Sequence, residues 1–123
     1  MLRSAEASIL NVIIENWFDL TATPEAVNGL LDELDGEVGL CADFGNWPRP
    51  RKYEDLPKIM RRAEVCHAKF EFETADTLDT ADAEACIKIA RDADFAGPYV
   101  LVNGGIGPSD WDGLAVQRAA LSK

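Results

Sequence analysis

The sequence predicts an α/β fold of four consecutive strand–helix units around a parallel sheet. Short apolar stretches of strand length alternate with longer stretches whose apolar residues recur at helical spacing. Each helical stretch is long enough to carry the chain back to the start of the next strand, as parallel pairing requires. No linker rich in Pro, Gly or Ser divides the 123 residues, so we interpret residues 1–123 as a single domain.

Four stretches have the composition of strands buried on both faces, because each is a short and largely apolar run. Their expected ranges are Leu10 to Ile14, Val38 to Ala42, Val65 to Phe72 and Tyr99 to Val102. A complete barrel of eight βα units needs about 250 residues. The four units therefore correspond to half of a (β/α)8 barrel, or to a small open sheet.

Helices are expected after each of these strands. Thr23 before Pro24 is a strong start signal, because threonine caps a helix and proline suits its first position. Pro57 is expected in the first turn of its helix, since a proline deeper inside would break it. The first helix is expected from Thr23 to Gly36, and the second ends near Ala63. The third begins with a cap at Asp79 or Thr80, and the last runs from Asp110 through Ala120.

Charge and cysteine content exclude several classes of function. Twelve Lys and Arg against 22 Asp and Glu give a net charge of −10, which would repel nucleic-acid phosphates. Cys41, Cys66 and Cys86 are odd in number and form no C-x-x-C pair, which argues against a disulfide scaffold and a zinc finger. No segment approaches the ~20 apolar residues of a membrane span, and the first ten residues lack a signal-peptide pattern. We expect a cytoplasmic protein without nucleic-acid or membrane partners.

Each predicted strand leads to a candidate metal ligand. These ligands are Glu15, Asp43, His67 and Asn103, and successive members are separated by about one βα unit. The carboxyl ends of parallel strands converge on one rim, where ligands bind. The sequence therefore predicts a divalent-metal site for Mn²⁺ or Mg²⁺, and the histidine also allows Co²⁺ or Zn²⁺.

Each of these residues also has a purely structural interpretation. Glu15 could cap the loop that follows it. Asp43 could order a turn with Gly45 and Asn46. His67 is the only histidine, and a single histidine near a strand end is often just hydrogen-bonded.

Three short segments carry the pattern of a known family. They are Ile14-Glu15-Asn16, Cys41-Ala42-Asp43-Phe44-Gly45-Asn46 and Cys66-His67-Ala68-Lys69. Together they resemble the sugar isomerase/epimerase superfamily with the xylose isomerase-like TIM barrel. The resemblance covers nearly the whole chain and maps it onto the C-terminal half of that barrel. There the family carries Glu, Asp, His and Glu after successive strands, which correspond by position to Glu15, Asp43, His67 and Asn103.

The resemblance implies a metal-dependent sugar isomerase or epimerase that moves a proton next to a carbonyl through a metal-stabilised enediolate. In the family, the first and last glutamates act as acid–base groups on either face of the substrate. Here Asn103 replaces the last glutamate, and an amide oxygen can coordinate a cation but cannot take up a proton. This favours one-base aldose–ketose isomerisation, with Glu15 as both metal ligand and catalytic base.

Residues beside the predicted ligands are candidate substrate contacts. Asn46 stands three residues after Asp43, where the family places such a contact, and a turn role is the alternative. Lys69 alternates with His67, so both point to the same side of the strand. It could contact a substrate oxygen or pair with a neighbouring glutamate. The other two candidates are Trp17 and Trp47, which could stack on a sugar, seal the barrel mouth or lie in an interface.

A local basic cluster of three residues lies between positions 49 and 52. It could hold a phosphate, but a solvated loop is the preferred interpretation, because no phosphate-cradling glycine motif accompanies it.

A catalytically inactive half-barrel that binds a ligand or a partner chain is the alternative function. In either case the first and last strands of half a barrel are open edges, which invite pairing. We therefore expect a homodimer that closes a barrel-like assembly, or association with a missing N-terminal half. A zinc endonuclease related to the same barrel fits poorly with one histidine and a net charge of −10.

Overall fold

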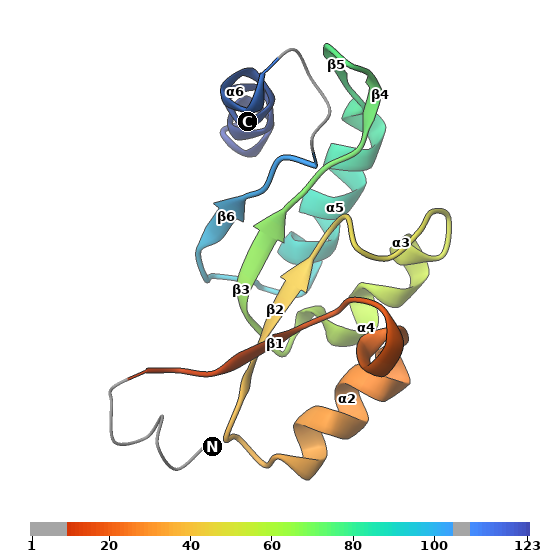
Figure 1. Cartoon of the computed structure of the whole chain (residues 1–123), viewed down its shortest axis with the longest axis vertical. Coiled ribbons are helices and arrows are strands. Elements are labelled where there is room, and N and C mark those ends of the chain that lie inside the picture. Colours follow the sequence, from red (N-terminus) through yellow and green to blue (C-terminus); the bar gives the residue numbers. More distant parts are fainter. Residues whose placement is uncertain (1–9, 105–108) are drawn as a thin grey trace.

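A computed structural model of the chain describes residues 10–104 and 109–123, and its centre is a four-stranded parallel sheet (Figure 1). The strands are β1 (Ile13–Glu15), β2 (Gly39–Asp43), β3 (Ala63–Ala68) and β6 (Tyr99–Leu101). They lie side by side in the order β1-β2-β3-β6, and each neighbouring pair is parallel. The predicted α/β class with a parallel sheet is confirmed.

Helices connect successive strands, as the sequence predicts. They are η1 (Asp19–Thr21) and α2 (Pro24–Glu33) after β1, α3 (Lys52–Asp55) and α4 (Pro57–Met60) after β2, α5 (Thr80–Asp92) before β6, and α6 (Asp110–Leu121) after it. The Thr23 side chain accepts the Ala26 N–H, and the Asp79 side chain accepts the Asp82 N–H. Both residues are therefore N-caps: Thr23 as predicted, and Asp79 from the predicted choice of Asp79 or Thr80. None of the helices in the described part of the chain is long and apolar enough to cross a membrane.

The helices α2, α4 and α5 cover one face of the sheet (Figure 1). The strands succeed one another in a single direction, and right-handed crossovers then place the connecting helices on the same side. Alternate side chains of β2 and β3 form the core with these helices. The buried apolar residues of this layer include Val27, Leu31, Leu40, Ala42, Ile59, Met60, Cys66, Ala68, Ala83, Cys86 and Ala90.

The opposite face of the sheet has no helical layer within the described residues. We call it the open face. Ile13 and Val100 lie on it, and they are 41% and 45% exposed. The predicted burial on both faces is confirmed for the interior of β2, from Leu40 to Asp43, but is wrong for β1 and β6. The outer strands are packed on one side only, because nothing in the described chain covers the other.

The third strand ends earlier than predicted. β3 stops at Ala68, whereas the prediction extended it to Phe72. Beyond Ala68 the chain leaves the sheet so that Phe70 packs on Phe44 in the core, with ring centroids 5.7 Å apart. Phe72 instead begins an antiparallel hairpin of β4 (Phe72–Thr74) and β5 (Thr77–Leu78).

The second predicted helix is also shorter than expected. Pro57 begins α4, so it lies in a first turn as predicted, but it separates α4 from α3. The helical segment ends at Met60, and Ala63 is already the first residue of β3. At the start of the chain, β1 begins at Ile13 rather than Leu10.

Lys52 is fully buried, so the expected solvated basic loop is wrong for this residue. Its Nζ lies 2.6 Å from Asp82 Oδ1, which is also fully buried, and donates to the Phe44 carbonyl oxygen at 3.1 Å. A buried charge requires such compensation. The other two basic residues also form ion pairs, Arg49 with Asp79 and Arg51 with Asp55.

Candidate metal centre

Three of the four predicted ligands meet at the carboxyl rim of the sheet. Glu15 ends β1, Asp43 ends β2, and His67 lies one residue before the end of β3. The strand register pairs Asp43 with His67 and places Glu15 beside Cys41 on the same face. One potential ligand atom from each residue lies within 4.8 Å of the other two. His67 Nδ1 is 3.2 Å from Glu15 Oε1 and 3.4 Å from Asp43 Oδ2.

Asp43 is held by the turn that follows β2. Its Oδ1 accepts the N–H groups of Gly45 at 2.7 Å and Asn46 at 2.8 Å, so the predicted turn role is confirmed. Its Oδ2 faces His67. Desolvation by burial raises the pKa of the Asp43 carboxyl to about 6; the Gly45 N–H opposes this effect and Glu15 adds to it. A divalent cation at this point would favour the ionised carboxylate.

Asn16 joins the ends of β1 and β2, a role that the sequence analysis missed. Its side chain is fully buried; Nδ2 donates to the Asp43 carbonyl oxygen at 3.0 Å, and Oδ1 accepts the Asp43 N–H at 2.7 Å. An amide carries both a donor and an acceptor, so it can replace one step of strand pairing. The available signal was a polar residue directly after an apolar strand.

Asn46 and Lys69 extend the cluster through hydrogen bonds. Asn46 Nδ2 donates to Glu15 Oε1 at 2.8 Å, and its Oδ1 accepts from Lys69 Nζ at 3.1 Å. Gly45 permits this arrangement, because a Cβ there would lie 2.7 Å from the Lys69 carbonyl oxygen. Lys69 thus contacts the cluster through Asn46.

The two candidate tryptophans have different environments. Trp17 is 46% exposed, and Lys69 Nζ lies 5.5 Å from the centre of its ring. Trp47 is 3% exposed, and its indole N–H donates to the Thr21 carbonyl oxygen at 3.1 Å. Trp47 therefore belongs to the core, and Trp17 has the more accessible ring.

Asn103 faces α6 and makes its described contacts there. Its Nδ2 donates to Asp110 Oδ1 at 2.9 Å, while its Oδ1 is buried without a hydrogen-bond donor among the described residues. A Cβ at Gly113 would lie 2.8 Å from that Oδ1, so the helix approaches it closely. The carboxylate and imidazole cluster consists of Glu15, Asp43 and His67, whereas the contacts described for Asn103 are with α6.

Cys41 is the register partner of Glu15 and precedes Asp43 by two residues on β2. Burial, together with Glu15 and Asp43, raises the pKa of its thiol to about 12. It therefore stays protonated at neutral pH in the metal-free chain, and it is not among the residues whose ligand atoms lie within 4.8 Å of one another. All three cysteines are buried and free, as expected for a chain that is not a disulfide scaffold.

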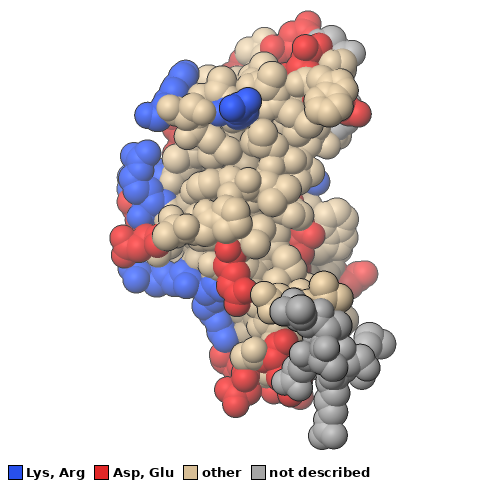
Figure 2. All heavy atoms as spheres, turned by 90° about the vertical axis from the view of Figure 1, so that its left-hand side faces the viewer, with Lys and Arg blue, Asp and Glu red and all other residues tan. Residues whose placement is uncertain are grey.

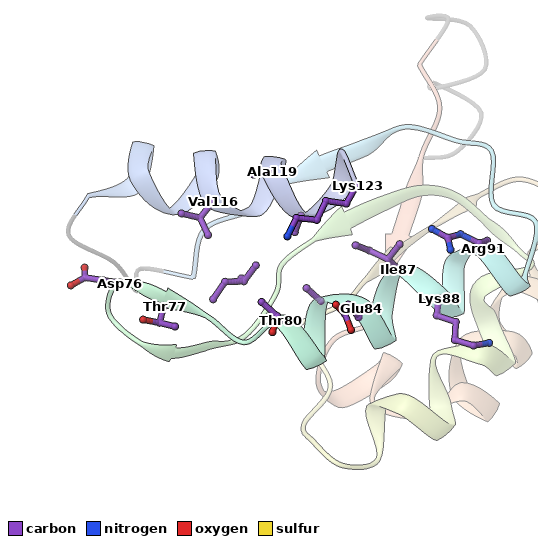
Figure 3. A pocket seen from close by; sticks show the side chains of 13 residues that line it. Asp76, Thr77, Thr80, Glu84, Ile87, Lys88, Arg91, Val116, Ala119 and Lys123 are labelled. Carbon is purple, nitrogen blue, oxygen red and sulfur yellow. The ribbon is translucent and has the colours of Figure 1, made fainter.

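A pocket of about 600 Å³ lies apart from this cluster, between α5, α6 and the β4–β5 hairpin (Figure 3). None of the predicted site residues lines it. Its apolar wall consists of Leu78, Ala83, Ile87, Val116, Ala119 and Ala120.

Comparisons with known proteins assign no family to the chain. No protein-family model matches the sequence, and no curated protein matches it significantly.

Proposed function

We propose that the chain is the C-terminal half of a xylose isomerase-like barrel and binds a divalent metal through Glu15, Asp43 and His67. The observation that carries this proposal is the convergence of two carboxylates and one imidazole from three adjacent strands within 4.8 Å. Oxygen donors suit Mn²⁺ or Mg²⁺, and the imidazole also allows Co²⁺ or Zn²⁺. Three protein ligands leave coordination positions for oxygens of a substrate.

The hydrogen bonds around the cluster fit this role. Backbone N–H groups occupy Asp43 Oδ1 and leave Oδ2 directed toward His67. Asn46 orients Glu15 Oε1, which also lies near the imidazole. Two carboxylates this close repel each other when both are ionised, and a cation between them would remove that repulsion.

Proton transfer beside the carbonyl of a small aldose or ketose is the reaction that we infer for this site. A bound metal would polarise that carbonyl. The Glu15 side chain is 31% exposed on the open face, where a substrate carbon can approach it, so Glu15 would move the proton. Lys69 supplies a positive charge for a substrate oxygen, and Trp17 an accessible ring. Because Asn103 is not a base, isomerisation by one base is favoured over epimerisation by two.

Metal binding is tested first, by titrating the metal-free chain with Mn²⁺ and measuring free Mn²⁺. We expect one site per chain, and an affinity at least tenfold lower in Glu15→Gln and in His67→Ala. Glu33→Gln, an exposed change of the same chemistry on α2, should bind like the wild type. If the folded wild-type chain binds no Mn²⁺, the alternative of a catalytically inactive half-barrel that binds a ligand or partner is favoured.

The reaction is tested by incubating the Mn²⁺-loaded chain with a panel of small aldoses and ketoses in D₂O. Deuterium should appear at the carbon next to the carbonyl, together with the isomeric sugar. Both signals should be absent in Glu15→Gln at Mn²⁺ concentrations that saturate the variant. Exchange that survives this substitution would rule out Glu15 as the base while leaving the metal site intact.

A further inference from the structure

We propose that a second copy of this chain closes the sheet into a barrel. In this assembly a twofold axis parallel to the strands relates the two copies, and β6 of each copy pairs with β1 of the other. The proposal concerns the open edges and the open face, so it does not depend on whether the cluster binds a metal.

The two edge strands carry few of the features that prevent pairing, and Glu15 at the carboxyl end of β1 is their one charged residue. β1 and β6 each have one strand neighbour within the described residues. Residues 10–14 and 99–104 contain no charged residue, although 28% of the chain is charged. Edges that remain unpaired usually carry lysine, proline or a bulge. With a net charge of −10 on each copy, edges whose one charged residue is Glu15 are where two copies can approach with the least repulsion.

Apolar side chains are exposed along both edges. Val12 and Ile13 at the β1 edge are 37% and 41% exposed, and Val100 at the β6 edge is 45% exposed. Figure 2 views the molecule from the side on which β6 lies in Figure 1, and a broad region without Lys, Arg, Asp or Glu crosses the middle of this surface. Covering these side chains would remove apolar surface from water.

An identical partner satisfies both edges at once. A twofold axis parallel to the strands preserves strand direction, so each new β6–β1 pair is parallel, like every pair within the chain. Pairing β1 with β1 would instead be antiparallel and would leave β6 open. The closed assembly has eight strands, the number at which side chains just fill a barrel interior. Its helical layer lies outside, and the two open faces enclose the interior.

The assembly has a consequence for the metal cluster. Both clusters would lie at the same mouth, because all strands run in one direction. Glu15 ends β1, an edge strand, so the carboxyl end of the partner subunit's β6 would border its carboxylate. The second copy would thus supply a wall that the single chain lacks on this side of the site.

The experiment is sedimentation equilibrium of the full chain over a range of concentrations and salt. We expect twice the 13.5 kDa mass of one chain, with tighter association at higher salt because the net charge is screened. Val100→Lys on β6 and Val12→Lys beside β1 should each weaken dimerisation at least tenfold. Val116→Lys on α6, where the side chain is similarly exposed at 38%, should leave it unchanged.

Circular dichroism checks that each variant is folded; since the substituted side chains are exposed in the single chain, the monomer should tolerate lysine there. A chain that stays monomeric at all concentrations would overturn the proposal, as would species that keep growing beyond two copies. A dimer that persists in both edge variants would also overturn it. Mn²⁺ titration of Val12→Lys separates the two proposals. Val12 precedes β1 and alternates with Ile13, so its side chain lies on the side away from the cluster, and the monomer should retain its metal site even when the dimer is lost.

Discussion

The two oxygens of the Asp43 carboxylate have different surroundings. Oδ1 accepts two backbone N–H groups of the turn after β2, while Oδ2 lies 3.4 Å from His67 Nδ1. The side chain is nearly inaccessible to water, and this burial is the main reason that the pKa of its carboxyl rises to about 6. Keeping the carboxylate ionised at neutral pH therefore destabilises the folded metal-free chain.

This pKa shift predicts a pH dependence of stability. Between about pH 4 and pH 6 the folded chain holds the Asp43 proton more tightly than the unfolded chain does, so the free energy of unfolding falls as pH rises. A shift of this size corresponds to roughly 3 kcal/mol. Urea unfolding of the metal-free chain across this range should show the fall.

Asp43→Asn should remove most of that pH dependence, because the amide oxygen can still accept both turn hydrogen bonds without a charge. Asp32→Asn, an exposed substitution on α2, is the matched control and should retain the wild-type slope. Equal slopes in the wild type and in Asp43→Asn would show that another group dominates.

At the scale of elements, the buried pair of Lys52 and Asp82 joins α3 to α5. Both side chains are inaccessible to water, and Asp82 also accepts the Tyr53 hydroxyl and the Glu71 N–H. Taking one partner away leaves the other charge buried and uncompensated. The pair therefore fixes how α3 packs on α5.

Asp82→Ala should lower the free energy of unfolding by about 3–5 kcal/mol, as expected when one member of a buried ion pair is removed. The double variant Lys52→Met/Asp82→Ala should lose less than the sum of the two single changes, because neither charge is then left alone. Asp32→Ala breaks an exposed pair with Arg62 and should cost at most about 1 kcal/mol. Additive losses in the double variant would contradict the coupling, and urea unfolding measures all four quantities.

At the scale of the whole molecule, the strand order decides which surfaces remain uncovered. Successive strands are added to the sheet in one direction, so the connecting helices lie on one face, and neither edge is paired within residues 10–104 and 109–123. The candidate metal cluster lies on the open face beside exposed apolar side chains. Site and proposed interface are therefore neighbours.

Thermal unfolding should depend on chain concentration if two copies close the barrel. The midpoint temperature of the wild type should rise as the concentration increases a hundredfold, because association stabilises only the folded state. Val100→Lys should show no such rise, whereas Val116→Lys should behave like the wild type. A midpoint independent of concentration in the wild type would count against the dimer.

Much of the site could be predicted because it follows from strand order. A residue at the carboxyl end of one parallel strand lies near its counterparts on neighbouring strands, so Glu15, Asp43 and His67 had to converge once the strands were recognised. The orientation of Asn103 follows a different rule. It depends on contacts with Asp110 and Gly113, and thus on how α6 returns to the sheet.

The sequence by itself determined the α/β class, the cap at Thr23, a cap at Asp79 or Thr80, and the meeting of Glu15, Asp43 and His67 at the strand ends. These features depend on neighbouring residues or on a repeated pattern. Only the tertiary structure decided the burial of Lys52, the bridge made by Asn16 and the early end of β3. Each of these depends on a partner distant in the chain. Lys52 pairs with Asp82, Asn16 bonds to Asp43, and beyond the end of β3 the Phe70 N–H donates to Gln117 Oε1. Such pairings arise when packing brings separate elements together, and no local pattern specifies them.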